Sequence, residues 1–231
     1  IELPAVQRRV VEALKTAGKR IVFVNFSGAA IALEPESLNC EAILQAWYPG
    51  QAGGQAVAEV LFGDYNPAGK LPLTFYRNLA QIPDFEDYNM TGRTYRYMKE
   101  TPLFPFGHGL SYTTFKYGKL KMNDDKIAVG QNLNLVIPVT NTGSRDGDEV
   151  VQVYLKKMDD TEGPVKTLRA FKRVRIPAGK TVEVKFSLDD TQLEWWDEQS
   201  NTMRVCPGNY TVMIGGTSCE KSLLSRAFTI R

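Results

Sequence analysis

The second half of the chain carries a two-residue alternation of apolar and polar side chains, and this feature constrains the fold most. Val182, Val184, Phe186 and Leu188 alternate with polar partners over one such stretch. Because successive side chains of a strand face opposite sides of a sheet, the pattern predicts strands with one buried face. Further runs of this kind occupy residues 133–139, 151–155, 168–176, 210–214 and 228–230, with turn sequences between them.

Seven or so short strands at this spacing predict a β-sandwich over residues 118–231. The region has no Cys-Trp-Cys pattern, which argues against the antibody-like version. An all-β sandwich of the immunoglobulin or fibronectin type III-like class is therefore expected. Trp195 and Trp196 lie within it, either as a platform on which a sugar stacks or as one core side chain beside one edge side chain.

Residues 1–76 show a different organisation, in which helical and strand patterns alternate. Apolar residues at 6, 10, 11 and 14 have helical spacing, and residues 21–26 form a continuous apolar run typical of a parallel strand covered on both faces. A second strand at 42–47 and a helix at 55–62 follow. Two such strands cannot complete a sheet, so we expect a parallel-sheet remnant of an α/β sandwich whose other strands are supplied elsewhere. Residues 71–76 are predicted as a short edge strand broken by Pro72.

Residues 77–117 connect the two regions and are rich in aromatic side chains. Exposing so many rings together would be costly, so they are expected to pack as an ordered interdomain strap. Arg93 and Tyr95 lie in this strap and, with Trp196, are the candidates for substrate binding. For the strap, an interdomain clamp made by cation–π contacts and hydrogen bonds is favoured over direct substrate contact.

Charge and composition exclude several classes of function. The 28 basic residues are mixed with 26 acidic ones, so no broad field favours nucleic acid or a membrane, and no apolar run approaches the length of a bilayer span. Three cysteines, at 40, 206 and 219, favour reduced thiols, although Cys206 and Cys219 could pair. The first residues carry no signal peptide and resemble a cut inside a longer protein.

Few residues in the chain have the arrangement of a reaction centre. His108 is the only histidine and is interpreted as a structural loop residue, because no nucleophile elbow accompanies it. Glu34 and Glu36, and the carboxylates at 84, 86 and 87, could act in acid–base chemistry only if one of a pair were desolvated. Ligands for a metal site are too few, and no cofactor is expected.

Several motifs in fixed order resemble the C-terminal third of family 3 glycoside hydrolases, a family of β-xylosidases and β-glucosidases. They are LPAVQ at 3–7, YPGQAGG at 48–54, VLFGDYNPAGKLP at 60–72, PLFPFGHGLSYT at 102–113, VTNTG at 139–143 and EVVQVY at 149–154. A tyrosine is usual in the family where His108 stands. The stretch FEDYNMTGRTYRY at 85–97 looks more like the β-xylosidase and arabinosidase branch.

The resemblance implies a retaining, exo-acting β-glycosidase acting in plant polysaccharide breakdown and either secreted or periplasmic. In that family the nucleophile belongs to an N-terminal barrel and the acid/base precedes the LPAVQ segment, so no catalytic residue is carried over and the chain alone is expected to be inactive. Its partners would be that barrel and an oligosaccharide, and assembly into a homo-oligomer is compatible with the resemblance. The alternative is a non-catalytic carbohydrate-binding or adhesion module.

Overall fold

A computed structural model describes residues 1–231, and their contacts divide the chain into two compact units. The first unit holds residues 1–65, 72–94 and 98–106, and the second holds residues 66–71, 95–97 and 107–231. The predicted strap of residues 77–117 is thus shared between the units. No helix is both long enough and apolar enough to cross a membrane.

The first unit consists of short helices around a pair of strands. Its elements are α1 (Ala5–Thr16), β1 (Val22–Asn25), α2 (Glu34–Asn39), β2 (Ala42–Gln45), α3 (Gly53–Phe62) and the 3-10 helix η1 (Leu79–Gln81). β1 and β2 pair in parallel, with Val22 opposite Ala42, which confirms the predicted α/β arrangement. Gly63 closes α3 in the left-handed region, as expected for a glycine after the last helical residue.

Much of the apolar surface in the first unit lies open. Val6, Val10 and Leu14 follow one another along α1 and remain 59%, 56% and 41% exposed, whereas Val11 is buried. Val22 at the start of β1 is also half exposed. The cover that a central parallel strand needs on both faces is therefore not supplied within this unit.

The edge strand predicted at residues 71–76 does not form. Its backbone makes isolated contacts instead: Phe75 bridges Phe104 in the first unit, and the amide of Phe75 donates to the Phe104 carbonyl at 2.9 Å. Pro72 has no N–H to donate, so a continuous ladder cannot start there. Phe75 is nevertheless fully buried, with the ring of Trp47 packed edge-on at 6.2 Å.

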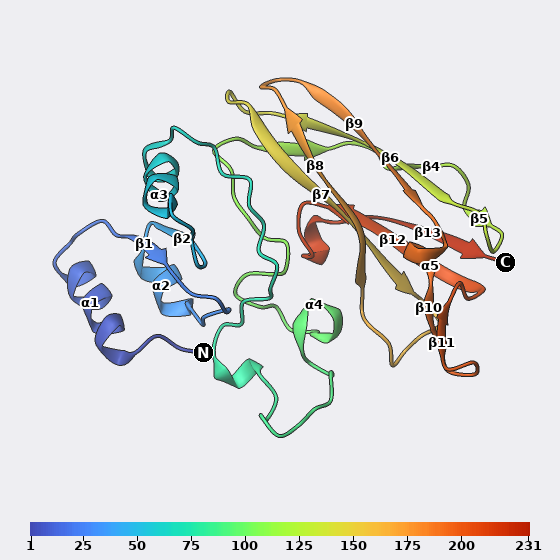
Figure 1. Ribbon diagram of the computed structural model, residues 1–231, viewed down its shortest axis with the longest axis horizontal. Coiled ribbons are helices and arrows are strands. Elements are labelled where there is room, and N and C mark those ends of the chain that lie inside the picture. Colours follow the sequence, from blue (N-terminus) through green and yellow to red (C-terminus); the bar gives the residue numbers. More distant parts are fainter. The chain divides into compact units, whose positions relative to one another are not determined.

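The second unit is a β-sandwich, as predicted, and its two sheets face each other in Figure 1. One sheet has the order β5-β13-β12-β7-β8, and the other is built on β6, which pairs with β3, β4 and β9. The strands are β3 (Phe115–Tyr117), β4 (Lys121–Met122), β5 (Lys126–Ile127), β6 (Leu133–Asn141), β7 (Gly147–Lys157), β8 (Thr167–Ile176), β9 (Thr181–Leu188), β12 (Gly208–Gly215) and β13 (Leu224–Ile230).

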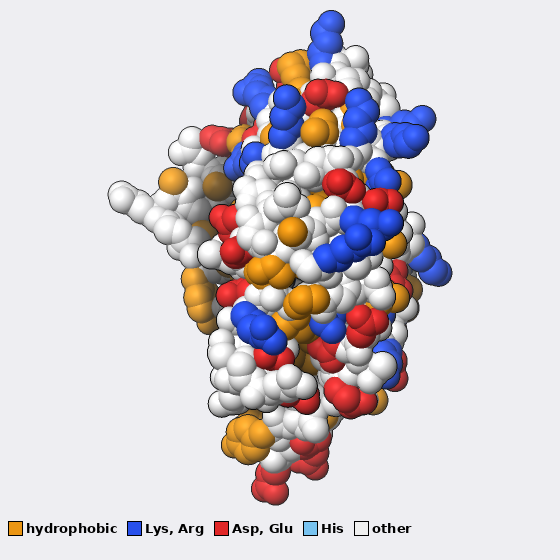
Figure 2. Space-filling model, turned by 90° about the vertical axis from the view of Figure 1, so that its right-hand side faces the viewer, with side chains coloured by type: hydrophobic (Ala, Val, Ile, Leu, Met, Phe, Trp, Pro, Cys, Tyr) orange, Lys and Arg blue, Asp and Glu red, His pale blue; other side chains and the backbone are white.

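The inward-facing residues of the alternating runs form one core between the sheets. Leu133, Leu135, Ile137 and Val139 of β6 are all completely buried. On the other sheet the core side chains of β7 are Val151, Val153 and Leu155, and those of β12 are Tyr210, Val212 and Ile214. Acidic and basic side chains are interspersed on the face in Figure 2, as the balanced composition predicts.

Five smaller elements complete the described structure. α4 (Thr94–Tyr97) lies in the strap, the η2 turn (Glu220–Ser222) precedes β13, and α5 (Asp190–Leu193) follows β9. Asp189 caps α5 by accepting from the Thr191 amide at 2.9 Å. After α5 an unpredicted hairpin joins β10 (Trp195–Asp197) to β11 (Thr202–Arg204). All three cysteines are free thiols, in agreement with the reduced state favoured by the sequence.

Candidate functional site

Parts of two family-like motifs, residues 66–71 and 107–113, lie side by side in the second unit. The Leu71 amide donates to the His108 carbonyl at 2.8 Å, and the Gly107 amide donates to the Leu71 carbonyl at the same distance. The Asn66 carboxamide oxygen accepts from the Ser111 hydroxyl at 2.9 Å. A side chain at Gly109 would collide with the backbone of the neighbouring motif. Glycine is thus needed there because two backbones approach closely.

Lys70 and Glu149 form a buried ion pair beneath these motifs. The Lys70 Nζ lies 3.2 Å from a Glu149 carboxylate oxygen, and the two side chains are only 15% and 7% exposed. Burial raises the pKa of Glu149 above its ordinary value, although the Lys70 ammonium acts to lower it. The pair joins residues 66–71 to β7 and can provide specific positioning at the cost of desolvating two charges.

His108 and Tyr117 border this ion pair. Burial lowers the pKa of His108, and the nearby Lys70 charge lowers it further, so the imidazole stays neutral at physiological pH. Burial and the Glu149 charge raise the pKa of the Tyr117 phenol, so it stays protonated. A structural role of His108 stays a prediction.

The outer face of β7 is covered by residues of the strap that belong to the second unit. The Tyr154 hydroxyl donates to the Gln152 side chain, whose Nε2 donates to the carbonyls of Gly216 at 2.7 Å and Gly107 at 3.2 Å. Gly107 has φ +77, and a side chain there would strike Gln152. β7 is therefore buried on both faces, and its polar side chains are satisfied internally.

Tyr95 is one of the strap residues that cover this face. Its hydroxyl accepts from the Leu168 amide of β8 at 3.2 Å, and its ring meets Tyr154 edge-on at 5.9 Å. These contacts anchor the strap to the sandwich through a backbone hydrogen bond and an aromatic pair. A role of Tyr95 in substrate binding stays a prediction.

Arg93 organises the loop that contains it, in the first unit. Its guanidinium donates to the carbonyl oxygens of Asn89 at 3.1 Å, Asp84 at 3.0 Å and Asp87 at 2.5 Å. These bonds hold residues 84–93, which we call the aromatic loop. Substrate contact by Arg93 stays a prediction, and its observed contacts are to its own loop.

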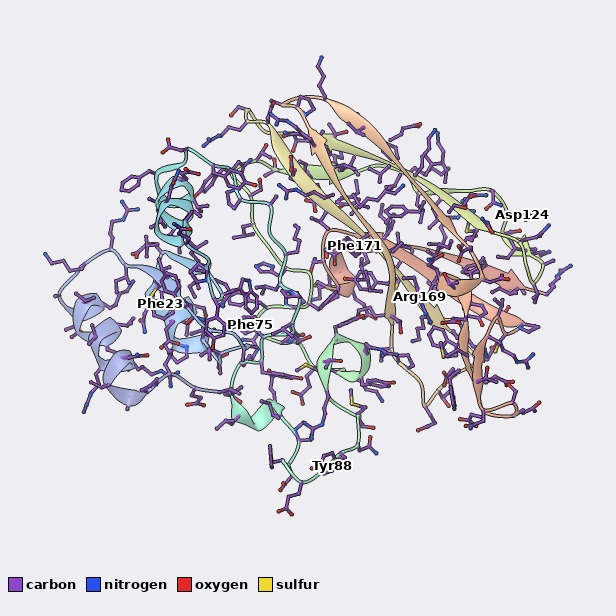
Figure 3. The ribbon with its side chains drawn as sticks, viewed as in Figure 1. Phe23, Phe75, Tyr88, Asp124, Arg169 and Phe171 are labelled. Carbon is purple, nitrogen blue, oxygen red and sulfur yellow. The ribbon has the colours of Figure 1, made fainter.

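The expectation that all rings of the strap pack is wrong for the aromatic loop. Phe85 and Tyr88 are 92% and 90% exposed, and Tyr88 lies at the tip of the loop in Figure 3. Arg93 and successive turns satisfy the loop backbone locally, so the rings need not be buried to hold it. Phe75 and Phe104, by contrast, pack together with ring centroids 6.3 Å apart.

Trp195 and Trp196 differ in exposure, as expected for consecutive residues of a strand. Trp195 is 2% exposed, its Nε1 donates to Asp160 at 2.6 Å, and the Arg169 guanidinium, labelled in Figure 3, lies 5.3 Å from the centre of its ring. Trp196 is 50% exposed and pairs across the hairpin with Met203, itself 43% exposed. Trp195 is thus a core residue, and a sugar platform at Trp196 stays a prediction.

The acidic residues noted from the sequence are engaged elsewhere in the first unit. Glu36 is completely buried and pairs with Arg8 at 3.1 Å, and Glu34 pairs with Arg77 at 2.8 Å. In the aromatic loop the Asp84 carboxylate caps a turn by accepting from the Glu86 amide at 3.0 Å. Glu34, Glu36 and Asp84 therefore have structural roles.

The sequence reasoning missed the Lys70–Glu149 pair. The two residues are 79 positions apart, and no local pattern joins them. One signal was available, because Glu149 has the same parity along β7 as Val151 and Val153 and so occupies an inward-facing position. A carboxylate on a core face needs a partner, which predicts a buried cation without identifying it.

The Glu149→Gln variant tests the raised pKa. A carboxyl group with a raised folded-state pKa binds its proton more tightly in the folded protein, so stability falls as pH rises from 4.5, its ordinary value, through the raised value. We expect the variant to lose less stability than the parent between pH 4.5 and neutrality, measured by urea denaturation at each pH. Glu183→Gln, at an exposed position, is the control. Parallel pH profiles for parent and Glu149→Gln would contradict the assignment.

Comparison with known proteins identifies both parts of the chain. Residues 1–112 match the glycosyl hydrolase family 3 C-terminal domain, and residues 149–218 match the fibronectin type III-like domain. A xylan 1,4-beta-xylosidase of Xylanibacter ruminicola is 54% identical over 100% of this chain, which covers 26% of that protein. A periplasmic beta-glucosidase of Salmonella typhimurium is 39% identical over 95% of the chain and is covered to 30%.

A solved structure shows the same fold. The β-glucosidase of Erythrobacter marinus superposes with a TM-score of 0.87 at 38% identity, over 100% of this chain and 30% of that structure. The chain thus spans about a quarter to a third of the length of these relatives. The matched domains and the order of the motifs lead to one assignment: this chain belongs to glycosyl hydrolase family 3, of which it carries the C-terminal domain followed by the fibronectin type III-like domain.

Proposed function

We propose that this chain is the C-terminal part of a retaining, exo-acting β-glycosidase that removes terminal β-linked sugars during plant polysaccharide breakdown. β-D-xylosides are the favoured substrates and β-D-glucosides the next. The observation that carries the proposal is the 54% identity, over the whole chain, to a protein named xylan 1,4-beta-xylosidase. The resemblance of residues 85–97 to the β-xylosidase branch supports the same choice.

The proposal places catalysis outside this chain. A retaining glycosidase needs two carboxyl groups about 5–5.5 Å apart, one as nucleophile and one as acid/base. The family resemblance assigns both to segments upstream of residue 1. Within the chain, Glu36 forms an ion pair with Arg8, and Glu149 forms one with Lys70. These pairings favour a structural rather than a catalytic role for both carboxylates. The chain alone is therefore proposed to be inactive.

Exposed apolar side chains in the first unit support the proposal that this chain is part of a longer protein. The stripe formed by Val6, Val10 and Leu14 on α1 is aliphatic and contiguous at helical spacing, and Val22 lies open at the start of β1. Such surface favours burial against further protein, because burying an aliphatic side chain contributes roughly 1.5–3 kcal/mol. We propose that the rest of the α/β domain covers it. A secreted or periplasmic location is proposed from the Salmonella typhimurium relative, which is named periplasmic.

The test compares the full-length protein with residues 1–231 alone. We expect the full-length enzyme to release nitrophenol from an aryl β-D-xyloside faster than from the matching β-D-glucoside, and the isolated chain to release none above background. Proton NMR should show the β-anomer of xylose as the first product, as double displacement requires. Turnover by the isolated chain, or an α-anomer as first product, would contradict the proposal.

A further inference from the structure

The aromatic loop is held in one conformation by its own hydrogen bonds. Besides the three carbonyl contacts of Arg93, the Asp87 carboxylate accepts from the Asn89 amide and the Asn89 side chain accepts from the Thr91 amide, both at 2.8 Å. Gly92, at φ +76, provides the left-handed turn that brings Arg93 back beneath the loop. The backbone that carries the two exposed rings is therefore ordered before any partner arrives.

Both aromatic rings of this loop are almost fully exposed. Phe85 and Tyr88 are three residues apart and 92% and 90% exposed. An ordered loop that presents two rings to solvent forgoes the burial that such side chains favour, which is typical of a binding surface. Pre-ordering the loop also lowers the conformational entropy lost on binding.

The composition around the rings decides which partner fits. Asp84, Glu86, Asp87 and Asn89 interleave with Phe85 and Tyr88, so carboxylates and an amide neighbour both rings along the chain. Burial against another protein surface would desolvate three carboxylates within four residues, and acidic residues are depleted in the cores of protein interfaces. The aliphatic stripe on α1 in the same unit has one acidic residue, Glu12, between its members, against three within four residues of the loop, and fits protein packing instead.

A neutral sugar satisfies both features of the loop. The C–H face of a pyranose is apolar and can lie on an aromatic ring, whereas its hydroxyl groups are donors to carboxylate and amide oxygens. The surrounding carboxylates can stay partly hydrated, so their desolvation cost is small. Relatives named for β-xylosides and β-glucosides act on molecules of this class.

We propose that Phe85 and Tyr88 form a sugar-stacking subsite for a β-linked neutral oligosaccharide, with Arg93 as the residue that positions the loop. This inference rests on the proposed glycosidase function and deepens it. Stacking on one unit of an oligosaccharide contributes to the binding of longer substrates, so the proposal predicts an effect on chain-length preference rather than on bond breaking.

The experiment uses the full-length enzyme with the single variants Phe85→Ala and Tyr88→Ala. Each is expected to raise the KM for xylotriose about three- to tenfold, the loss of one ring contact, with kcat unchanged. The KM for an aryl β-D-xyloside, which has a single sugar, should stay the same. Arg93→Ala should raise the xylotriose KM in the same direction, because it frees the loop. Phe171→Ala, at a 65% exposed ring on β8 of the sandwich, is the matched control and should change neither constant.

Two results would overturn the subsite. The first is an unchanged xylotriose KM in both ring variants. The second is a lowered thermal midpoint of the full-length enzyme with unchanged kinetics, which would make the rings a packing contact with the rest of the polypeptide. If the full-length protein hydrolyses no β-glycoside, the proposed function fails separately. Calorimetric titration with xylotriose then decides the subsite: binding that is lost in Phe85→Ala supports it, and the absence of heat with the parent protein rejects it.

Discussion

The Lys70→Met variant is expected to lose about 3–5 kcal/mol of unfolding free energy at neutral pH, the usual cost of removing one partner from a buried ion pair. The Glu149 side chain is only 7% exposed, so without the ammonium 3.2 Å away its charge has neither water nor a cation. The methionine keeps the length of the lysine stem, so the loss comes from the ammonium group, which also donates to the Gly109 carbonyl at 3.1 Å. Urea denaturation followed by tryptophan fluorescence measures it.

A second variant separates electrostatics from packing. Adding Glu149→Gln to Lys70→Met removes the uncompensated charge and should restore at least half of the lost stability. In a Trp47→Phe background the tryptophan fluorescence reports on the second unit alone, because the other two tryptophans, Trp195 and Trp196, lie there. If the double variant loses as much as the sum of the single variants, the two side chains are not coupled and the ion pair does not hold the motifs in place.

The Leu135→Ala variant is expected to lose about 2–5 kcal/mol of unfolding free energy. Leu135 is completely buried on β6, where it lies opposite Phe186 of β9 and Met122 of β4. Truncation leaves a cavity between two sheets that cannot easily collapse onto it. The same urea experiment reports the loss.

Leu110→Ala is the matched control, because Leu110 belongs to the same unit and is 77% exposed. The same chemical change there should alter the unfolding free energy by about 0.5 kcal/mol or less. Similar losses in both variants would mean that the alternating residues of β6 do not form the core of the sandwich.

The sandwich could be predicted because its signal is local. The alternation of apolar and polar residues indicates the buried face of each strand. The predicted positions of β6, β7, β8, β9 and β12 therefore lie within a few residues of their observed bounds. The β10–β11 hairpin was not predicted, because three-residue strands are too short to show a period. The predicted edge strand at 71–76 failed because apolar content alone does not supply a pairing partner, and Pro72 removes a donor.

The candidate site was less predictable, because its contacts are not signalled by a local pattern. The motifs at 60–72 and 102–113 indicated a family, but their mutual pairing through Leu71, Gly107 and His108 depends on two backbones meeting in space. Phe85 and Tyr88 were expected to pack because rings usually do. Their exposure follows from local hydrogen bonds of Arg93, which no hydrophobic pattern records.

By itself, the sequence determined the fold classes, the strand positions and the family, because periodicity, turn residues and ordered motifs are properties of neighbouring residues. Only the tertiary structure decided that Lys70 neutralises Glu149, that Trp195 is buried while Trp196 is not, and that the aromatic loop presents its rings to solvent. These are matters of distance and burial between residues far apart in the chain or of competing local bonds. Spacing shows that Glu149 faces inward on β7, but it identifies neither its partner nor the bonds that compete with burial.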